Sequence, residues 1–219
     1  MIPPDADPQP GPVGATAPVP LLLLISAPSG AGKTTLCDHL LAEVPGLTRA
    51  ITCTTRPPRA GEEPGVHYHF LNPEEFEARV QAGDFLEHAT VYGNRYGTLK
   101  LEVLQRLRAG RDVLLNVDVQ GAATVRDQAA RDPELKRSLV TVFVTTPSVL
   151  ELERRLAGRG QDSPEVIQRR LAEARRELAA APRFDYLIVS GSREEDQRRV
   201  LAIYEAERVR SHRTPVPQF

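Results

Sequence analysis

The chain has 219 residues, of which 41% are hydrophobic and 26% charged, a composition typical of a soluble globular protein. Its formal net charge of −1 excludes a global positive field that would draw it to nucleic acid or to an anionic membrane. Its two cysteines, Cys37 and Cys53, are too few for a disulfide framework, and their spacing does not match a metal site.

The first twenty residues contain seven prolines and almost no large apolar side chains. Such a segment cannot bury enough surface to offset its ordering entropy, so residues 1–20 are predicted to form a disordered tail. The start lacks the basic region of a signal peptide, and no apolar run approaches the roughly 20 residues of a membrane span. We therefore expect a cytoplasmic protein with no membrane or nucleic-acid partner.

From residue 21 onward, apolar runs alternate with segments of helical periodicity. Continuous apolar runs are typical of parallel strands that are covered on both faces. Four such runs lie at residues 21–26, 113–117, 139–144 and 186–189. Helices are expected between them and over 194–208, so the pattern predicts an α/β fold with a parallel sheet flanked by helices.

Helix boundaries are marked by capping residues. Thr98 is predicted to cap a helix that stops at Gly110. Ser148 and Glu151 match a capping box, and Ser163 precedes a proline at the favoured first helical position.

One stretch interrupts the alternation. Residues 51–97 are rich in Thr, Tyr, His and Gly, with a short helix suggested after Asn72. We interpret this stretch as an inserted, partly β subdomain. The expected organisation is a core of residues 21–50, 98–146 and 182–208, an insert at 51–97, a helical lid at about 147–181 and a tail at 209–219.

A glycine-rich segment follows the first predicted strand and opens a helix near Lys33. In this context backbone N–H groups and the helix N-terminus can hold phosphates. Lys33 is predicted to contact the β- and γ-phosphates of ATP, and the Thr34 hydroxyl to bind Mg²⁺. The first glycine of the GxxxxGK[ST] pattern is replaced by Ala27. The candidate ATP-binding residues are Ala27, Pro28, Ser29, Gly30, Ala31, Gly32, Lys33 and Thr34.

A second acidic element is expected beside this loop. The run at 113–117 ends in Asp118, as in a Walker B strand. Asp118 is a candidate ligand of Mg²⁺ or of substrate-bound water. The alternative is that Asp118 only caps the next helix.

The insert at 51–97 contains the candidate residues that bind the phosphate acceptor. Arg56 and Arg59 lie on a proline-stiffened loop, where guanidinium groups can bind a second phosphate bidentately. Tyr68 and Tyr96 can add phenolic donors. Glu87 offers a carboxylate that matches the N1–H and 2-amino donors of guanine.

Adenine lacks the N1–H and 2-amino donors of guanine, so Glu87 favours guanine over adenine by roughly 1–3 kcal/mol. Thr52 or Thr98 can donate to the guanine O6 atom.

Six segments together resemble the guanylate kinase family over nearly all of residues 21–208. They read SAPSGAGKTTL, TCTTRPPRAGE, GVHYHF, FLEHATVYGNRYGT, VLLNVDVQGA and RLAGRGQDS. The resemblance implies a three-layer P-loop NTPase core with a GMP-binding insert and a helical lid. It also implies Mg²⁺-dependent transfer of the γ-phosphate of ATP to GMP, and dGMP is expected as a further substrate.

The resemblance also implies roles for individual residues. The matching GMP-site residues are Thr52, Arg56, Arg59, Tyr68, Glu87, Tyr96 and Thr98. The matching arginines that reach the transferred phosphate and ATP are Arg155, Arg159 and Arg170. This chain departs from the family pattern at Thr52, where serine is usual, at Asn116, where an acid is common, and at Ser190-Gly191, where the family has Asn-Asp.

Direct transfer needs positioning and charge stabilisation, so no nucleophilic residue or phosphoenzyme is predicted. Histidines near the acceptor residues are interpreted as polar loop residues, and Arg154 as a solvated one. Two alternatives stay open from the sequence: a kinase for UMP or AMP, and a non-catalytic guanylate-kinase-like module that binds other proteins. Glu87 argues against the first, and Lys33 with the lid arginines against the second. The sequence does not indicate an oligomeric state.

Overall fold

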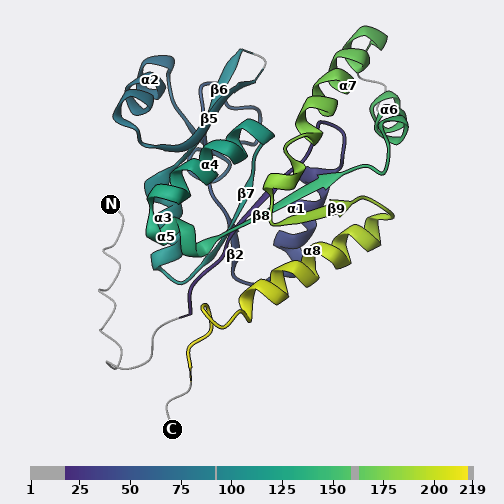
Figure 1. Ribbon diagram of the computed structural model, residues 1–219. Coiled ribbons are helices and arrows are strands. Elements are labelled where there is room, and N and C mark those ends of the chain that lie inside the picture. The colour runs from purple at the N-terminus through teal and green to yellow at the C-terminus, as the bar shows by residue number, and fades with distance from the viewer. Residues whose placement is uncertain (1–17, 92, 159–162, 217–219) are drawn as a thin grey trace.

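The computed structural model describes residues 18–91, 93–158 and 163–216. Its centre is a five-stranded sheet in which every pair of neighbouring strands is parallel. The strand order is β2-β7-β1-β8-β9, with β1 in the middle (Figure 1). The strands are β1 (Leu22–Ser26), β2 (Leu47–Arg49), β7 (Asp112–Asn116), β8 (Leu139–Thr145) and β9 (Tyr186–Val189).

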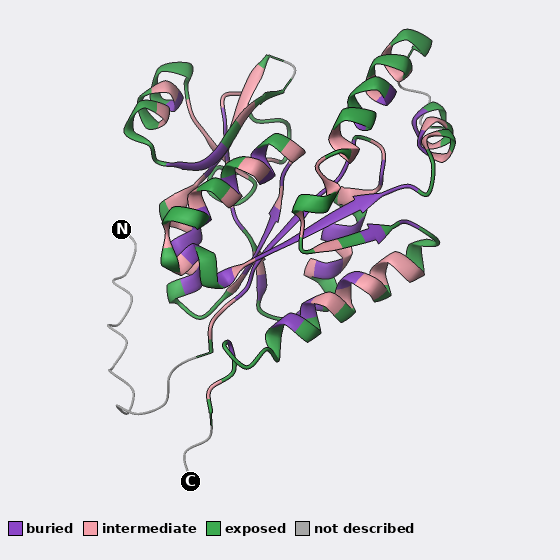
Figure 2. Ribbon diagram, in the orientation of Figure 1, coloured by how far each residue is buried: buried purple, intermediate pink, exposed green. Residues whose placement is uncertain are grey.

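Alternation of side chains along β1 divides the core into two halves. Leu23 and Ile25 point into one apolar cluster, and Leu22 and Leu24 into the other. Helices α1 (Lys33–Glu43) and α8 (Arg193–Arg208) cover the first face. Helices α3 (Lys100–Arg108), α4 (Val119–Arg131) and α5 (Pro133–Ser138) cover the second. The result is a three-layer α/β fold in which β1, β7 and β8 are buried on both faces (Figure 2). The edge strand β9 was expected to be covered in the same way, but Leu187 and Val189 are exposed because no further strand or helix of the described residues covers them.

A second sheet lies beside the core. It has four strands in the order β4-β3-β6-β5, and only the β3–β4 pair is parallel. The strands are β3 (Thr52–Thr54), β4 (Tyr68–Phe70), β5 (Phe85–Val91) and β6 (Asn94–Leu99). Helix α2 (Pro73–Ala82) packs on this sheet through Phe76, whose ring stacks on Phe85 with centroids 4.5 Å apart.

Two helices project from the other side of the core. Helix α6 (Val149–Ala157) and helix α7 (Pro164–Leu178) share a small apolar cluster built on Leu152, Leu156 and Leu171. We call α6 and α7 the helical pair. Figure 1 shows it opposite the second sheet, with both rising from the same end of the core. A short 3₁₀ helix, Ala181–Arg183, leads back into β9.

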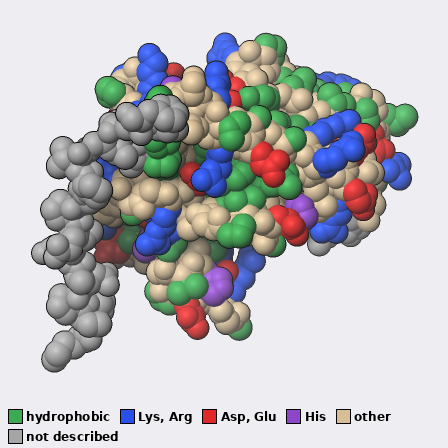
Figure 3. Space-filling view, turned by 90° about the horizontal axis from the view of Figure 1, so that it is seen from below, with side chains coloured by type: hydrophobic (Ala, Val, Ile, Leu, Met, Phe, Trp, Pro, Cys, Tyr) green, Lys and Arg blue, Asp and Glu red, His purple; other side chains and the backbone are tan. Residues whose placement is uncertain are grey.

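The two ends of the described chain lie together. The Val19 amide donates to the Arg213 carbonyl at 3.0 Å, and the buried Arg213 guanidinium lies 3.8 Å from Glu207. Residues 1–17 and 217–219, within the predicted tails, lie outside the described residues. On the face seen from below, charged side chains of both signs are interspersed (Figure 3). Among the described helices, none is long and apolar enough to cross a bilayer.

The sequence located four of the five core strands and missed β2. This strand has only three residues and carries no apolar run of its own. One cap was predicted wrongly, because Thr98 lies within β6 and α3 begins after Leu99 without a side-chain cap. Thr98 instead uses its hydroxyl within the second sheet.

The Ser148 cap is present, since its hydroxyl accepts from the Glu151 amide at 3.1 Å. The predicted reciprocal bond is absent, because the Glu151 carboxylate pairs with Arg154 and Arg155.

Candidate active site

The glycine-rich segment forms a tight turn between β1 and α1. Gly30 and Gly32 adopt φ of 96° and 95°, the left-handed region that favours glycine. A side chain at Gly30 would also collide with α6, because its Cβ would lie 2.8 Å from Leu156 Cδ2. Ala27 is buried at the end of β1, where its small side chain is accommodated. Ser29 in this loop and Thr34 in the first turn of α1 are exposed.

Lys33 is the first residue of α1 and bridges two core elements. Its Nζ donates to the Val117 carbonyl, 2.7 Å away, just beyond the end of β7. Burial lowers the pKa of the Lys33 ammonium, whereas Cys37, Asp118, Glu177 and Glu87 favour its charged form. The ammonium is therefore held at the carboxyl ends of the parallel strands, where α/β proteins bind ligands.

Asp118 caps the helix that follows it, which is the alternative that the sequence left open. Its Oδ1 accepts from the Gly121 amide at 2.7 Å, and Oδ2 accepts no hydrogen bond from the described residues. In the described part of the chain, no group of three or more His, Cys, Asp or Glu side chains gathers to hold a metal. Mg²⁺ commonly binds one or two protein oxygens, with phosphates and water as its other ligands. Asp118 Oδ2 and the exposed Thr34 hydroxyl fit that donor set.

A cleft of about 320 Å³ lies between the core and the second sheet, and we call it the sheet cleft. The predicted site residues that line it are Lys33, Thr52, Tyr68, Glu87, Tyr96, Thr98 and Asp118. Asn116, at the end of β7, also lines it. Acceptor and phosphate-loop residues far apart in the sequence are thus brought to one cavity.

Four of these residues form one row across the second sheet. Thr52 is paired with Tyr68 on one side and with Thr98 on the other, and Thr98 is paired with Glu87. Side chains opposite each other in neighbouring strands lie on the same face. Tyr96 is two residues from Thr98 and shares that face.

The Glu87 carboxylate is buried and hydrogen-bonded at the end of this row. Thr98 Oγ1 donates to Glu87 Oε1 at 2.7 Å, and the two residues are 2% and 7% exposed. Burial raises the pKa of Glu87. The hydrogen bond from Thr98 lowers this pKa, and the negative charge of Asp118 raises it. Gly121 leaves room for this group, since a Cβ there would lie 3.1 Å from Glu87 Oε2.

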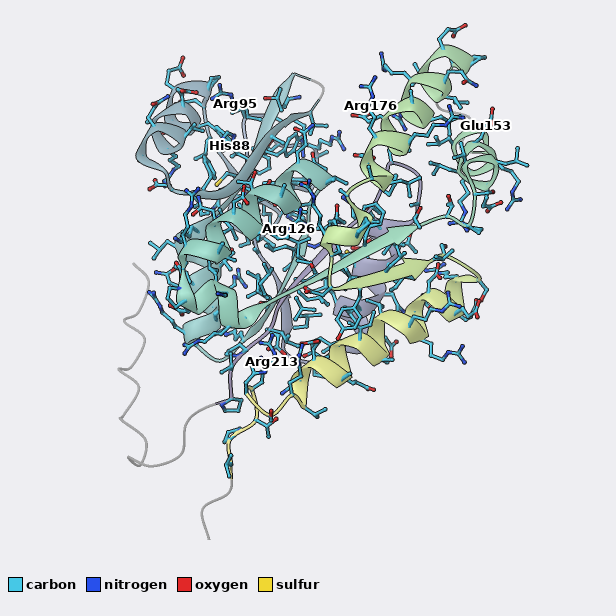
Figure 4. The ribbon with its side chains drawn as sticks, viewed as in Figure 1. His88, Arg95, Arg126, Glu153, Arg176 and Arg213 are labelled. Carbon is cyan, nitrogen blue, oxygen red and sulfur yellow. The ribbon has the colours of Figure 1, made fainter. Side chains whose placement is uncertain are left out.

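His88 faces the other side of the second sheet. Its ring lies 5.9 Å from the Phe85 ring and 6.4 Å from the Phe76 ring, beneath α2 (Figure 4). Glu87, Ala89 and Val91 line the sheet cleft with period two, and His88 does not. The structure therefore gives His88 no access to the cleft. His88 and His69 were expected to be loop residues, but they lie in strands β5 and β4.

Arg56 and Arg59 lie at and beyond the edge of the sheet cleft. The Arg56 guanidinium lies 5.4 Å from the centre of the Tyr68 ring and pairs with Glu62 at 2.8 Å. The second Glu62 oxygen accepts from the Arg59 amide at 2.7 Å. Glu62 was not singled out from the sequence, although an acid three residues after Arg59 is the signal for such a turn. The Arg59 side chain is exposed and does not line the cleft.

A second cleft, of about 240 Å³, lies on the other side of the phosphate loop, and we call it the loop cleft. It is lined by Gly32 and Thr35 of the core, Arg155 of α6 and Ser190-Gly191 after β9. Arg170 lies on α7 and is partly exposed, whereas Arg159 lies outside the described residues. Arg154 is largely exposed, as expected of a solvated side chain.

One acid near the phosphate loop was missed from the sequence. Glu177, near the end of α7, interacts electrostatically with Lys33 and Asp118. Burial, together with Glu173 and Asp118, raises the pKa of Glu177 to about 7. In the sequence, Glu177 lies next to the apolar residues of α7, which was the available sign that it is close to the buried face of this helix. The apolar pattern does not show which element packs against that side of the helix.

Comparisons with known proteins show which family this chain resembles. Residues 20–207 match the family model described as guanylate kinase. A guanylate kinase from Alkalilimnicola ehrlichii is 45% identical over 192 residues, which cover 88% of this chain and 91% of that protein. One from Neisseria gonorrhoeae is 47% identical over 192 residues, with coverages of 88% and 90%. The crystal structure of guanylate kinase from Anaplasma phagocytophilum superposes with a TM-score of 0.68 at 30% identity, covering 91% of this chain and 92% of that one.

Proposed function

The chain belongs to the guanylate kinase family, and we propose that the sheet cleft and the loop cleft are its GMP and ATP sites. The protein is an enzyme that transfers the γ-phosphate of ATP to GMP, giving ADP and GDP.

The observation that supports the GMP site best is the row Tyr68–Thr52–Thr98–Glu87 across the second sheet. Glu87 accepts from guanine N1–H and the 2-amino group, and a threonine hydroxyl of the row donates to O6. Thr98 already orients the carboxylate, so little side-chain freedom is lost when the base binds. Tyr96, Arg56 and Arg59 bind the GMP phosphate.

On the donor side, the phosphate loop binds ATP through its backbone amides. Lys33 contacts the β- and γ-phosphates from the first turn of α1, where the helix dipole also favours negative charge. The loop cleft receives the nucleoside of ATP, beside Ser190-Gly191. Thr34 and Asp118 hold Mg²⁺, which neutralises phosphate charge when bound.

The helical pair is assigned as the lid. Arg155, Arg159 and Arg170 bring positive charge to the transferred phosphoryl group, whose charge is spread over its equatorial oxygens. Closure over both clefts excludes water and limits ATP hydrolysis. The enzyme is expected to work in the cytoplasm, where its buried Cys37 and Cys53 stay reduced.

A coupled assay of ADP release tests this assignment. GMP is expected to be the best acceptor, followed by dGMP, with AMP and UMP far slower, and EDTA is expected to abolish turnover. Equal rates with AMP or UMP would contradict the GMP site. Absence of turnover with every acceptor, in a folded protein that binds GMP, would instead support a non-catalytic module.

A further inference from the structure

A chain of hydrogen bonds runs from α8 through the loop after β9 to α6. Its members are Glu151, Arg155, Ser190 and Asp196, and we call it the relay. We propose that Ser190 and Asp196 are positioning residues that hold the Arg155 guanidinium for phosphoryl transfer. The proposal rests on the proposed function, in which Arg155 contacts the transferring phosphate.

The relay is continuous in distance, and Arg155 donates to its neighbours on both sides. Arg155 Nε donates to Glu151 Oε1 at 2.8 Å, and its Nη1 donates to Ser190 Oγ at 3.1 Å. The Ser190 hydroxyl donates in turn to Asp196 Oδ2 at 2.5 Å. Arg155 Nη2 has no hydrogen bond within the described part of the chain, so it is available to a ligand.

The loop that carries Ser190 is itself fixed at both ends. The Ser190 amide donates to the Thr145 carbonyl at 2.7 Å, which extends the pairing of β8 and β9. The Gly191 amide donates to Asp196 Oδ1 at 2.9 Å, so both carboxylate oxygens of Asp196 are used. Ser190 is 4% exposed and the Asp196 side chain 15%, so water competes weakly for these bonds.

Gly191 borders the Glu195 carboxylate, the far end of a flexible and partly exposed side chain that can move aside. A Cβ at this position would lie 2.3 Å from Glu195 Oε2. Glu195 pairs with Arg199 at 3.1 Å, and Arg199 also donates to the Val189 carbonyl at 2.6 Å. Acids on the first turn of α8 thus lie against the Ser190-Gly191 loop, and Asp196 bonds to both of its residues.

The relay addresses a specific problem of catalysis by arginine. A long, flexible side chain must be held within a narrow range of positions to stabilise a transition state. Arg155 lines the loop cleft beside Gly32 and Thr35, and two of its nitrogens are already held. Arg154 shares the Glu151 carboxylate but is 77% exposed and has no bond to Ser190, which makes it a matched control.

The test compares the full-length enzyme with the variants S190A, S190T and D196A by steady-state kinetics with varied ATP and GMP. S190A and D196A are expected to lower kcat roughly tenfold with an unchanged KM for GMP, because only a transition-state contact is misplaced. S190T retains the hydroxyl and is expected to restore most of kcat. Melting temperatures identify any variant whose loss comes from unfolding, and R154A is expected to match the wild type.

A double-mutant cycle separates positioning from a general structural effect. If Ser190 acts through Arg155, S190A lowers kcat in the wild-type background and has no further effect in R155A. An equal loss in both backgrounds, or no loss in the folded S190A enzyme, would overturn the proposal. In that case an active wild type with an impaired R155A would leave the proposed function intact. A wild type that makes no GDP would contradict the proposed function itself.

Discussion

The second sheet and the helical pair flank the same core but hold their candidate residues differently. In the second sheet, Glu87 and Thr98 are buried and bonded to each other across neighbouring strands. In the helical pair, the Arg154 and Arg155 side chains are 77% and 27% exposed and share one carboxylate, Glu151. One region is set by strand register, and the other by ion pairs near the surface.

This difference matches the two tasks. Discrimination between bases needs donors and acceptors that are in place before the ligand arrives, which a sheet provides. Stabilising transferred charge needs groups that can approach after both substrates bind. An exposed ion pair contributes about 1 kcal/mol or less, which applies to Arg154, whereas Arg155 is less exposed and is also held by Ser190.

The largest effect is expected from the helical pair. Arg170→Ala should lower kcat about a thousandfold, the scale on which an arginine stabilises phosphoryl transfer, while KM for GMP stays unchanged. Arg169→Ala, at an exposed neighbouring position, should retain wild-type kinetics. The two variants are compared by the coupled assay at saturating GMP. A rise in KM for GMP with unchanged kcat would instead assign Arg170 to GMP binding and not to the transfer step.

A smaller effect, but one on selectivity, is expected in the second sheet. Glu87→Gln replaces an acceptor oxygen with an amide donor that faces the guanine donors, so kcat/KM for GMP should fall about 10- to 100-fold. The rate with AMP should not fall in parallel. His88→Gln, on the opposite face of β5, serves as the control and should leave both rates unchanged. An unchanged preference for GMP over AMP would refute base recognition by Glu87.

Gly121→Ala tests whether the Glu87 position depends on the space that α4 leaves. The added Cβ would lie 3.1 Å from Glu87 Oε2 and 3.2 Å from Val117 Cβ, so the carboxylate must shift. KM for GMP should rise a few-fold, roughly the cost of a misaligned hydrogen bond, while KM for ATP stays constant. Gln120→Ala, in the same turn but exposed, should change neither constant. Isothermal titration with GMP checks the shift in affinity directly.

The smallest effect concerns the pH dependence of stability. The pKa of Glu177 is raised from 4.5 to about 7, so the folded state holds this proton more tightly than the unfolded state. Stability should therefore fall as pH rises from about 4.5 to 7, and because Glu177 is only partly buried, solvent screening keeps this fall small.

Glu177→Gln should flatten this part of the profile, measured by urea unfolding between pH 5 and 7.5. Glu205→Gln, an exposed acid on α8, should keep the wild-type slope. Parallel stability profiles for wild type and Glu177→Gln would show that folding does not raise the pKa of Glu177.

Local patterns in the sequence predicted the features that depend on neighbouring residues. The phosphate loop, the strand that precedes it and the helix that Lys33 opens are all where the sequence placed them. The short helix after Asn72 and the Ser163 cap were also predicted, because both depend only on residues within one turn. Burial on both faces made β1, β7 and β8 recognisable, whereas the edge strand β9 was recognised by its apolar run although Leu187 and Val189 are exposed.

Features that depend on distant contacts could not be predicted in the same way. Thr98 was assigned to a helix cap because its hydroxyl precedes a helical pattern, yet its partner, Glu87, is on another strand. The row of four residues across the second sheet requires the register of strands that include an irregularity between Phe85 and Glu87. The relay likewise joins Arg155 to Asp196, which are separated by helix α7 and strand β9.

The contact between Gly30 and α6 has a consequence for how ATP and the lid influence each other. Leu156 and Leu152 lie so close to this glycine that a single added carbon would touch both. A movement of α6 relative to the core therefore changes the packing around Gly30 in the phosphate loop. Linkage then requires reciprocity: by whatever factor lid closure tightens ATP binding, bound ATP favours the closed lid by the same factor.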